Sequence, residues 1–422
     1  MNRRAFLVRL GATVATLPLL EGARAARAAR AAADSVGGPR DSAVAHPDSA
    51  NGTAPADTTT AGPRSLVIAA GGDTTLGYNL QAHFDQQLAA GTAKEQLWPL
   101  YFAGVRPILE AADVAVVNLE CPFTERGEKL KKNFNFRARP ELVNILAEGS
   151  VDVVSLANNH TADYGPLGVK DTIATLGHAR IAHFGAGTNL RQARKPAVLE
   201  RRGTKIGFIG YYFQAEPDML EPEEVYATAH RAGVAGCYKD LACVRGQIEQ
   251  DLARLVRTVD IAIPFFHWGR EGSYEVRDYQ MALAHRCVEL GCKAVLGAHP
   301  HRLQGIEVYR GAPIFYSLGN FVYGGIKEPS DTLTMIARMS FDRSGVRAEA
   351  IPVRFTSWPD RSFQPYVLEG EERELGLQRI GELSSSFRTT LPHLAAYRVA
   401  RGETLVLPVD APAETLKTGA PR

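Results

Sequence analysis

The sequence has almost no excess of charge and no glycine-rich phosphate loop. Its 422 residues carry 48 Lys and Arg against 46 Asp and Glu, which gives a formal net charge of +2. This balance offers no electrostatic reason to expect a nucleic-acid partner or adsorption to an anionic membrane surface. The segment GGDTTLG (71–77) lacks the closing Lys-Ser/Thr pair of a nucleotide-binding loop. We therefore expect neither a nucleic-acid-binding protein nor a protein that cradles phosphate in such a loop.

Cysteines are few, and their odd number excludes complete pairing. The chain has five. Cys237 and Cys243, in the segment GCYKDLAC, could close a small loop in an oxidising compartment, whereas Cys121, Cys287 and Cys292 are interpreted as buried thiols. The sequence leaves open whether the disulfide forms.

The N-terminus lacks a long apolar run, although it has basic residues and a short apolar stretch. Arg3 and Arg4 precede an apolar stretch that ends at Leu20, and an A-x-A site ends at Ala25. The stretch is shorter than the roughly 20 residues that span a bilayer, which argues against a membrane anchor. We predict a twin-arginine export signal over residues 1–25, and a location in the periplasm or on the outer face of the cytoplasmic membrane. Cleavage would change the formal net charge from +2 to −1, and uncleaved retention is the alternative.

Large apolar side chains are almost absent from residues 26–64, which are rich in Ala, Asp, Ser, Thr, Gly and Pro. Such a segment cannot bury enough apolar surface to fold, so we predict a disordered linker that tethers the folded part of the chain. We expect the main α/β unit over residues 65–332. Residues 333–422 are expected to add strands and a helix that complete the same domain.

Short β-branched runs alternate with helical segments from residue 65 onward, which is typical of a layered α/β fold. Most of these runs lack the alternation of a half-exposed strand, so we expect both of their faces to be covered. The expected strands are 65–71, 113–119, 151–157, 180–186, 205–212, 259–266, 293–298 and 313–319. The expected helices are 140–149, 167–178, 247–259 and 277–291. After residue 332 we expect two antiparallel strands and then a helix over 371–387.

Polar side chains follow five of the predicted strands, at the point where each strand ends. Taken singly, each has an ordinary explanation as a helix cap, a turn residue or a packed side chain. In open α/β sheets, however, ligands gather at the carboxyl ends of the strands. The residues that reach this edge are Asp73, Asn118, Glu120, Asn158, Asn159, His160, Asp163, His267, Glu271, His299 and His301.

This set combines imidazoles, carboxylates and an amide, which are the ligand types that first-row divalent metal ions favour. A bridging carboxylate can hold two ions about 3.5–4 Å apart. We therefore predict a divalent metal site, and we favour two ions over one. The ligand types do not distinguish Mn, Zn and Fe.

Six motifs stand in fixed order between about Ser65 and Tyr323. They are GDTTLG, NLECP, SLANNHTADYG, HWGRE, GAHPHRLQGIE and YSLGNF. Together they resemble the CapA family of poly-gamma-glutamate capsule-synthesis proteins, within the calcineurin-like metallophosphoesterase superfamily. The resemblance implies a four-layer α/β/β/α sandwich with metal at the strand ends. It also implies the ligand set, which matches the family's motifs at Asp73, Glu120, Asn159, His267, His299 and His301.

The chain departs from the superfamily's pattern at two positions. The first motif is usually Asp-x-His, but Thr75 stands at the histidine position, so one metal site loses a ligand. The bridging aspartate is replaced by the longer Glu120. A single ion, or a weak second one, therefore stays open.

Further residues can be given roles in a hydrolytic reaction. His160, oriented by Asp163, could protonate a leaving group, and Arg137 could bind a carboxylate or phosphate through its planar fork. Glu271, Gln304 and Asn320 are expected to fix imidazole tautomers from outside the ligand set.

Three functions are compatible with these features. The first is an exported metal-dependent hydrolase of an anionic polymer, for which the resemblance implies poly-gamma-glutamate or a related envelope polymer. The second is a non-catalytic accessory that binds the polymer, in association with a capsule-synthesis complex in the membrane. The third is a periplasmic phosphoesterase.

Overall fold

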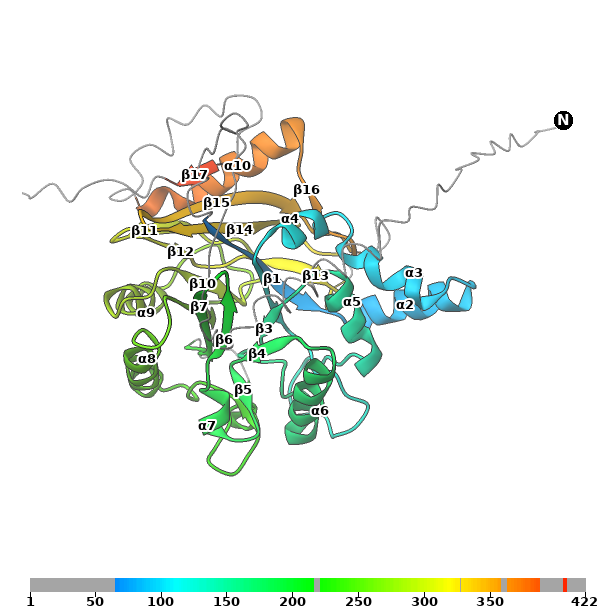
Figure 1. Ribbon diagram of the computed structural model, residues 1–422. Coiled ribbons are helices and arrows are strands. Elements are labelled where there is room, and N and C mark those ends of the chain that lie inside the picture. The colour runs from blue at the N-terminus through cyan, green and yellow to red at the C-terminus, as the bar shows by residue number, and fades with distance from the viewer. Residues whose placement is uncertain (1–64, 216–220, 327, 358–362, 388–404, 408–422) are drawn as a thin grey trace, which may run out of the picture. The chain divides into compact units, whose positions relative to one another are not determined.

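Two β-sheets face each other in the computed structural model, and helices cover their outer faces (Figure 1). The structure describes residues 65–215, 221–326, 328–357 and 363–387, and the backbone of 405–407. The predicted export signal and linker lie outside these residues. No helix in the described part of the chain is both long enough and apolar enough to cross a membrane.

The first sheet is built around β1, which pairs with parallel strands on one side and with C-terminal strands on the other. Its order is β16-β15-β14-β1-β2-β3-β4, and β13 pairs with the end of β1 while β17 pairs with β15. The strands are β1 (Leu66–Thr75), β2 (Val114–Leu119), β3 (Val153–Ser155), β4 (Ala182–Phe184), β13 (Asn320–Tyr323), β14 (Leu333–Asp342), β15 (Gly345–Arg354), β16 (Tyr366–Val367) and β17 (Leu405–Leu407).

The second sheet has the order β11-β12-β10-β9-β7-β6, with β7, β9, β10 and β12 parallel to one another. Its strands are β6 (Ala197–Arg201), β7 (Thr204–Tyr212), β9 (Ile261–His267), β10 (Val295–Ala298), β11 (Ile306–Tyr309) and β12 (Ala312–Phe315). A short pair, β5 (Ala186–Gly187) and β8 (Gly233–Val234), stands apart from both sheets.

Three apolar layers separate the sheets and helices, because alternate side chains of each strand point to opposite faces. On β2, Val114 and Val116 pack between the two sheets, whereas Ala115 and Val117 face the helices. On β9, Ile263 likewise packs between the sheets. The resulting order of helix, sheet, sheet and helix confirms the predicted four-layer α/β/β/α sandwich.

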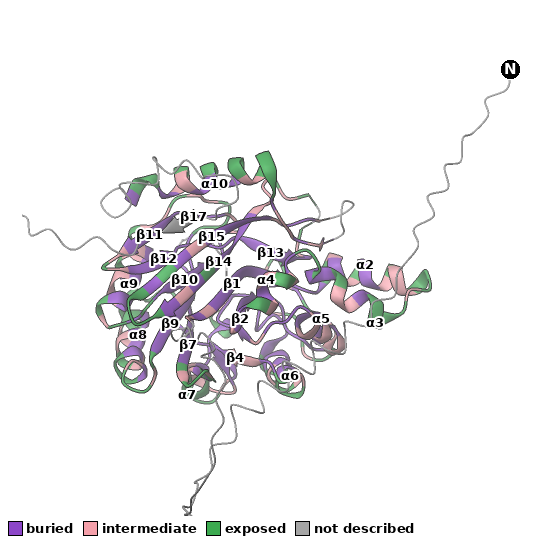
Figure 2. Ribbon diagram, turned by 45° about the horizontal axis from the view of Figure 1, so that its top comes forward, coloured by how far each residue is buried: buried purple, intermediate pink, exposed green. Residues whose placement is uncertain are grey.

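The helices divide between the two outer faces (Figure 1). Those of the first sheet are α2 (Tyr78–Ala89), α3 (Lys94–Leu97), α4 (Arg106–Ala111), α5 (Val143–Glu148) and α6 (Gly165–His178), and those of the second sheet include α8 (Leu241–Leu255) and α9 (Asp278–Glu289). The remaining helices are α7 (Leu190–Ala193), α10 (Gly370–Ser384) and the 3-10 turns at Trp98–Phe102, Pro140–Leu142, Glu223–Val225 and Ser385–Phe387. Figure 2 shows the exposed outer sides of α8, α9 and α10 against largely buried strands.

Helix α2 differs from the sequence-based expectation. Residues 78–89 form this helix, which was not predicted because its apolar stripe is short and consists of Leu80 and Phe84 with a buried His83. The expected C-terminal helix is present as α10, which places Leu377 and Ile380 into the layer between the sheets and closes the edge of the sandwich.

The structure confirms three cysteines as buried thiols and pairs the other two, which the sequence left open. Cys237 and Cys243 form a disulfide, and Cys121, Cys287 and Cys292 are free and buried. Burial raises the pKa of the Cys121 thiol to about 12, so this side chain packs as a small neutral group.

Candidate metal centre

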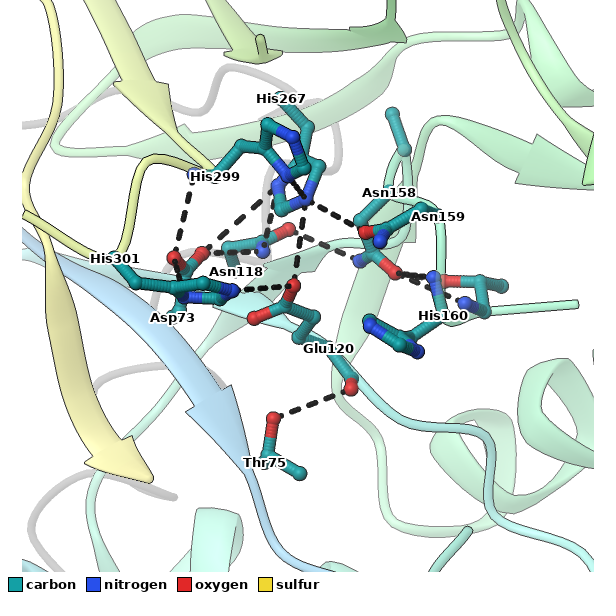
Figure 3. Close-up of polar contacts among 12 residues, drawn as sticks. Asp73, Thr75, Asn118, Glu120, Asn158, Asn159, His160, His267, His299 and His301 are labelled. Atoms are coloured by element: carbon teal, nitrogen blue, oxygen red, sulfur yellow. Dashed lines mark hydrogen bonds and ion pairs between the residues drawn. The ribbon is translucent and has the colours of Figure 1, made fainter. Parts of the chain in front are cut away.

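The predicted ligands meet where the carboxyl ends of strands from the two sheets lie close together (Figure 3). Asp73 lies near the end of β1, Glu120 follows β2, and Asn159 follows β3, all in the first sheet. The second sheet supplies the histidines: His267 ends β9, and His299 and His301 follow β10. Each sheet therefore contributes half of the polar cluster.

Local backbone geometry aims Asp73 into this cluster. The register of β1 shifts between Ala70 and Asp73, and such an irregularity turns a side chain to a new direction. Gly72 makes room for this because a Cβ there would lie 1.9 Å from the carbonyl oxygen of Gly319. The close approach lets the amide of Asp73 donate to that carbonyl at 2.9 Å, and it pairs Asp73 with Asn320 of β13.

The turn after β10 has an unusual backbone at both histidines. His299 has φ 102° and His301 has φ 53°, values that side chains with a Cβ seldom adopt. Strained conformations of this kind persist where the surrounding structure holds them, and they gather at functional sites. Here they direct two imidazoles one residue apart toward the same cluster.

Two groups of ligand atoms can be defined, and they share one residue. Glu120, His267 and His299 form the histidine-pair group, and Asp73, Glu120 and His301 form the carboxylate-pair group. In each group, one ligand atom per residue lies within 4.8 Å of the others. Because Glu120 belongs to both, its carboxylate could be shared by two ions.

Glu120 provides the strongest indication that the site is built for a cation. Its side chain is completely buried, and neither carboxylate oxygen accepts a hydrogen bond from the described residues. Its Oε1 has only longer contacts, with His267 Nε2 at 3.4 Å and His301 Nε2 at 3.9 Å. A buried carboxylate without hydrogen bonds costs free energy, and burial together with the Asp73 charge raises its pKa well above the usual range. A divalent cation would satisfy both oxygens, so the residues present fit a metal ion.

The imidazoles of the two groups differ in their protonation. Burial, and then the positive charge of neighbouring histidines, lowers the pKa of His267 and of His299 well below the usual value. Both rings are therefore neutral at pH 7, which is the form that binds metal. Burial also opposes the charged form of His301, but the carboxylates of Glu120 and Asp73 outweigh this and raise its pKa to about 10.

Two asparagines fix the ring of His267 (Figure 3). Asn159 Oδ1 lies 2.9 Å from His267 Nε2, and Asn118 Nδ2 lies 3.3 Å from His267 Nδ1. Asn118 also donates to Asp73 Oδ1 at 2.8 Å and accepts from Asn158 at 3.1 Å. It thus connects the two ligand groups.

Thr75 does not take the place of the missing histidine ligand. Its Oγ1 donates to the backbone carbonyl of Glu120 at 3.2 Å, and the side chain points away from the imidazoles (Figure 3). The carboxylate-pair group consequently contains a single histidine.

The predicted acid pair lies directly beside Asn159. His160 Nδ1 is 2.8 Å from Asp163 Oδ2, and the amide of Phe136 donates to the same oxygen at 2.5 Å. Phe136 also packs against the imidazole in a tilted arrangement, with 4.3 Å between ring centroids. With Nδ1–H held by the carboxylate, His160 Nε2 remains available to a substrate.

The remaining predicted residues lie at varying distances from the centre. Asn320 Oδ1 is 2.8 Å from His301 Nδ1, as expected of a residue that fixes a tautomer. Glu271 is exposed and acts on Glu120 through its charge. Arg137 is exposed, and its guanidinium lies 4.5 Å from the centroid of the Tyr164 ring.

Gln304 is placed differently from the prediction. Its amide oxygen accepts from Gln280, and its nitrogen donates to the backbone carbonyls of Ser273 and Glu275 at 3.3 and 2.8 Å. Among the described contacts it has none with a histidine. These two hydrogen bonds tie the Gln304 side chain to the backbone of the loop that follows β9.

Several residues at the site were given no role from the sequence. Asn118 was expected at the strand end but was assigned no function there, although it stands two positions before Glu120, a spacing that puts both on one strand face. No comparable signal was present for Gln214, whose amide lies 3.2 Å from His299 Nε2, or for Lys132 and Glu221, which form an ion pair at 2.9 Å.

Comparison with known proteins identifies the family. The family model described as Bacterial capsule synthesis protein PGA_cap matches residues 67–324. This chain belongs to that family. The match to PGA_cap covers all of the metal-site residues named above.

Two relatives illustrate the similarity. The chain is 31% identical over 226 residues to the capsule biosynthesis protein CapA of Bacillus anthracis, with 53% of each chain covered. It is 36% identical over 226 residues to a probable polyglutamine synthesis accessory protein of Mycobacterium tuberculosis, with 51% of this chain and 57% of that protein covered. The chain thus spans about half the length of the relatives it matches.

Among solved structures, a hypothetical protein from Thermus thermophilus aligns with 72% of this chain and 99% of its own length. The sequence identity is 16% and the TM-score is 0.40, too low to support an argument about function.

Proposed function

We propose that this chain is an exported, metal-dependent hydrolase that acts on poly-gamma-glutamate or a related anionic polymer of the cell envelope. The observation that carries the proposal is Glu120, a buried carboxylate without a hydrogen-bond partner among the described residues that is shared by two groups of metal ligands. The names of the relatives, a capsule biosynthesis protein and a polyglutamine synthesis accessory protein, support the polymer as substrate. We further propose that the protein works in association with a capsule-synthesis complex in the membrane.

The residues that would hold the metal are Asp73, Glu120, Asn159, His267, His299 and His301. When bound there, a divalent ion lowers the pKa of water and polarises a carbonyl or phosphoryl oxygen. Mn²⁺ suits this mixture of oxygen and nitrogen ligands, and we use it as the probe below.

The chain's own residues supply the proton and the orientation. Asp163 holds the Nδ1 proton of His160, so His160 Nε2 can present a proton to the leaving nitrogen or oxygen of the scissile bond. Arg137 is exposed and lies beside the Tyr164 ring, and its planar guanidinium can bind a carboxylate of the polymer. The buried walls around His267 and His299 exclude water from the imidazole side of the site.

A substrate panel tests the proposal. The full chain loaded with Mn²⁺ should cleave poly-gamma-glutamate, and the His160→Gln variant should lose about 100- to 10,000-fold in rate while it still binds Mn²⁺. His178→Gln, at an exposed histidine that ends α6, is the matched control and should keep the wild-type rate. If the protein cleaves a phosphodiester but not the polymer, the bond that it hydrolyses is a phosphoester and not an amide.

The second candidate is a polymer-binding accessory that does not catalyse a reaction. It is favoured by Thr75, which leaves the carboxylate-pair group with one histidine. Polymer binding without turnover of any substrate in the panel would establish this function and reject the hydrolase.

A further inference from the structure

A buried lysine lies between the metal ligands and the candidate acid pair. The side chain of Lys132 is 2% exposed, although it belongs to a loop whose neighbouring Lys131 is exposed. Its ammonium group has three N–H donors. The nitrogen donates to Asn159 O at 2.8 Å and to Glu221 Oε2 at 2.9 Å, and it forms an ion pair with Asp163 Oδ1 at 2.8 Å.

Two of these contacts bear on the orientation of Asn159. Lys132 fixes the peptide of Asn159 by donating to its backbone carbonyl. It also holds Glu221, whose Oε1 accepts from Asn159 Nδ2 at 3.1 Å. With its nitrogen bound in this way, the amide of Asn159 turns Oδ1 toward His267 Nε2, 2.9 Å away.

The third contact bears on the acid pair. Asp163 uses Oδ1 for Lys132 and Oδ2 for His160 Nδ1, so a single carboxylate joins the ammonium group to the imidazole. Without the ammonium group of Lys132, Asp163 and Glu221 would be two carboxylates near each other that have lost their shared cation, which is costly when they are buried.

We propose that Lys132 is a positioning residue that sets the side-chain amide of Asn159 for metal binding through Glu221, and ties this ligand to the His160–Asp163 pair. The inference rests on the metal site of the proposed function. Residues of this kind, which orient a ligand from outside, typically contribute about 10- to 100-fold in metal affinity.

The test is a double-mutant cycle read by calorimetric titration of the full chain with Mn²⁺. Lys132→Met and Glu221→Gln should each lower the Mn²⁺ affinity by about 10- to 100-fold. Because both act through the amide of Asn159, the double variant should lose no more than the weaker-binding single variant. Lys131→Met, at the adjacent exposed lysine, is the matched control and should bind as the wild type does.

Several outcomes would overturn the proposal. A folded Lys132→Met protein with wild-type Mn²⁺ affinity would reduce Lys132 to a structural ion pair. The same conclusion would follow if the fold-losses in Mn²⁺ affinity of the two single variants multiplied in the double variant, because the two residues would then act independently. If circular dichroism shows that Lys132→Met does not fold, Glu221→Gln decides alone, and wild-type affinity in that variant rejects the proposal.

The wild-type titration separates this inference from the proposed function. If the wild type binds Mn²⁺ but turns over no substrate, the hydrolase is rejected, and the double-mutant cycle still decides the role of Lys132. A wild-type protein that binds no Mn²⁺ overturns both.

Discussion

The histidine-pair group and the carboxylate-pair group share Glu120 but are built differently. His267 and His299 are at most 1% exposed, neutral, and backed by the amides of Asn159 and Gln214. The carboxylate-pair group has a single histidine, His301, whose side chain is 17% exposed and whose pKa is raised to about 10. One group is ready to bind a cation, whereas in the other the cation must displace a proton.

This difference indicates that two ions at this site would not be equivalent. The histidine-pair group offers neutral nitrogen ligands that need no deprotonation at pH 7, so we expect it to fill first. The carboxylate-pair group lies nearer to solvent and lacks a second histidine, because residue 75 is a threonine whose hydroxyl donates to the carbonyl of Glu120. We therefore expect it to hold a weaker, exchangeable ion.

The largest effect is expected at Glu120. Both ligand groups contain this residue, so its loss should affect the two groups alike. Glu120→Gln should abolish Mn²⁺ binding at both positions, as measured by calorimetric titration. The raised pKa means that the ionised carboxylate opposes folding of the metal-free protein at pH 7, so the same variant should stabilise that form by about 1 kcal/mol or more.

Glu128→Gln, at an exposed glutamate, is the control for this substitution and should change neither property. Retention of two bound ions in Glu120→Gln would show that Glu120 is not the bridge.

The next largest effects should separate the two groups. His299→Ala should remove the tighter Mn²⁺ ion and leave the weaker one, because it takes a ligand from the histidine-pair group alone. His301→Ala should do the reverse. Equilibrium dialysis with metal analysis would show one ion per chain in each variant. Equal loss of both ions in the two variants would mean that the groups are a single site.

A smaller, matched pair of changes concerns the residues that hold the imidazoles. Gln214→Ala removes the amide beside His299, and Asn320→Ala removes the oxygen beside His301. Each should weaken only the ion of its own group, by about 10- to 100-fold. If either variant weakens the other group's ion instead, the assignment of these partners is wrong.

The smallest effect is expected at Thr75. Thr75→Val removes one buried hydrogen bond to the carbonyl of Glu120 and keeps the shape of the side chain. The free energy of unfolding should fall by about 0.5–1.5 kcal/mol in urea titrations, with the Mn²⁺ affinity of both groups nearly unchanged. Loss of the weaker ion would show that Thr75 is itself a ligand.

Much of the metal centre was predictable because parallel strands deliver their carboxyl ends to one edge. Each predicted ligand lies at or just beyond the end of a strand that the β-branched pattern identifies, and Asn118 shares the strand face of Glu120. The four-layer sandwich came from the resemblance to a family, and the structure confirms it.

The unpredicted part depends on contacts between distant segments of the chain. Lys132 and Glu221 are 89 positions apart, and no period or motif connects them. Gln304 was expected beside a histidine, but its direction is set by the loop after β9. Side-chain direction outside regular strands follows from packing, which the sequence pattern does not record.

The central claim is that Glu120 bridges two unequal metal positions, and electron paramagnetic resonance during Mn²⁺ titration of the wild-type chain tests it most directly. The first equivalent should give the spectrum of an isolated ion, and the second should give a spin-coupled pair, since a bridging carboxylate holds two ions about 3.5–4 Å apart. A protein that binds Mn²⁺ no more tightly than Glu120→Gln, or that binds two ions without coupling, would contradict the account.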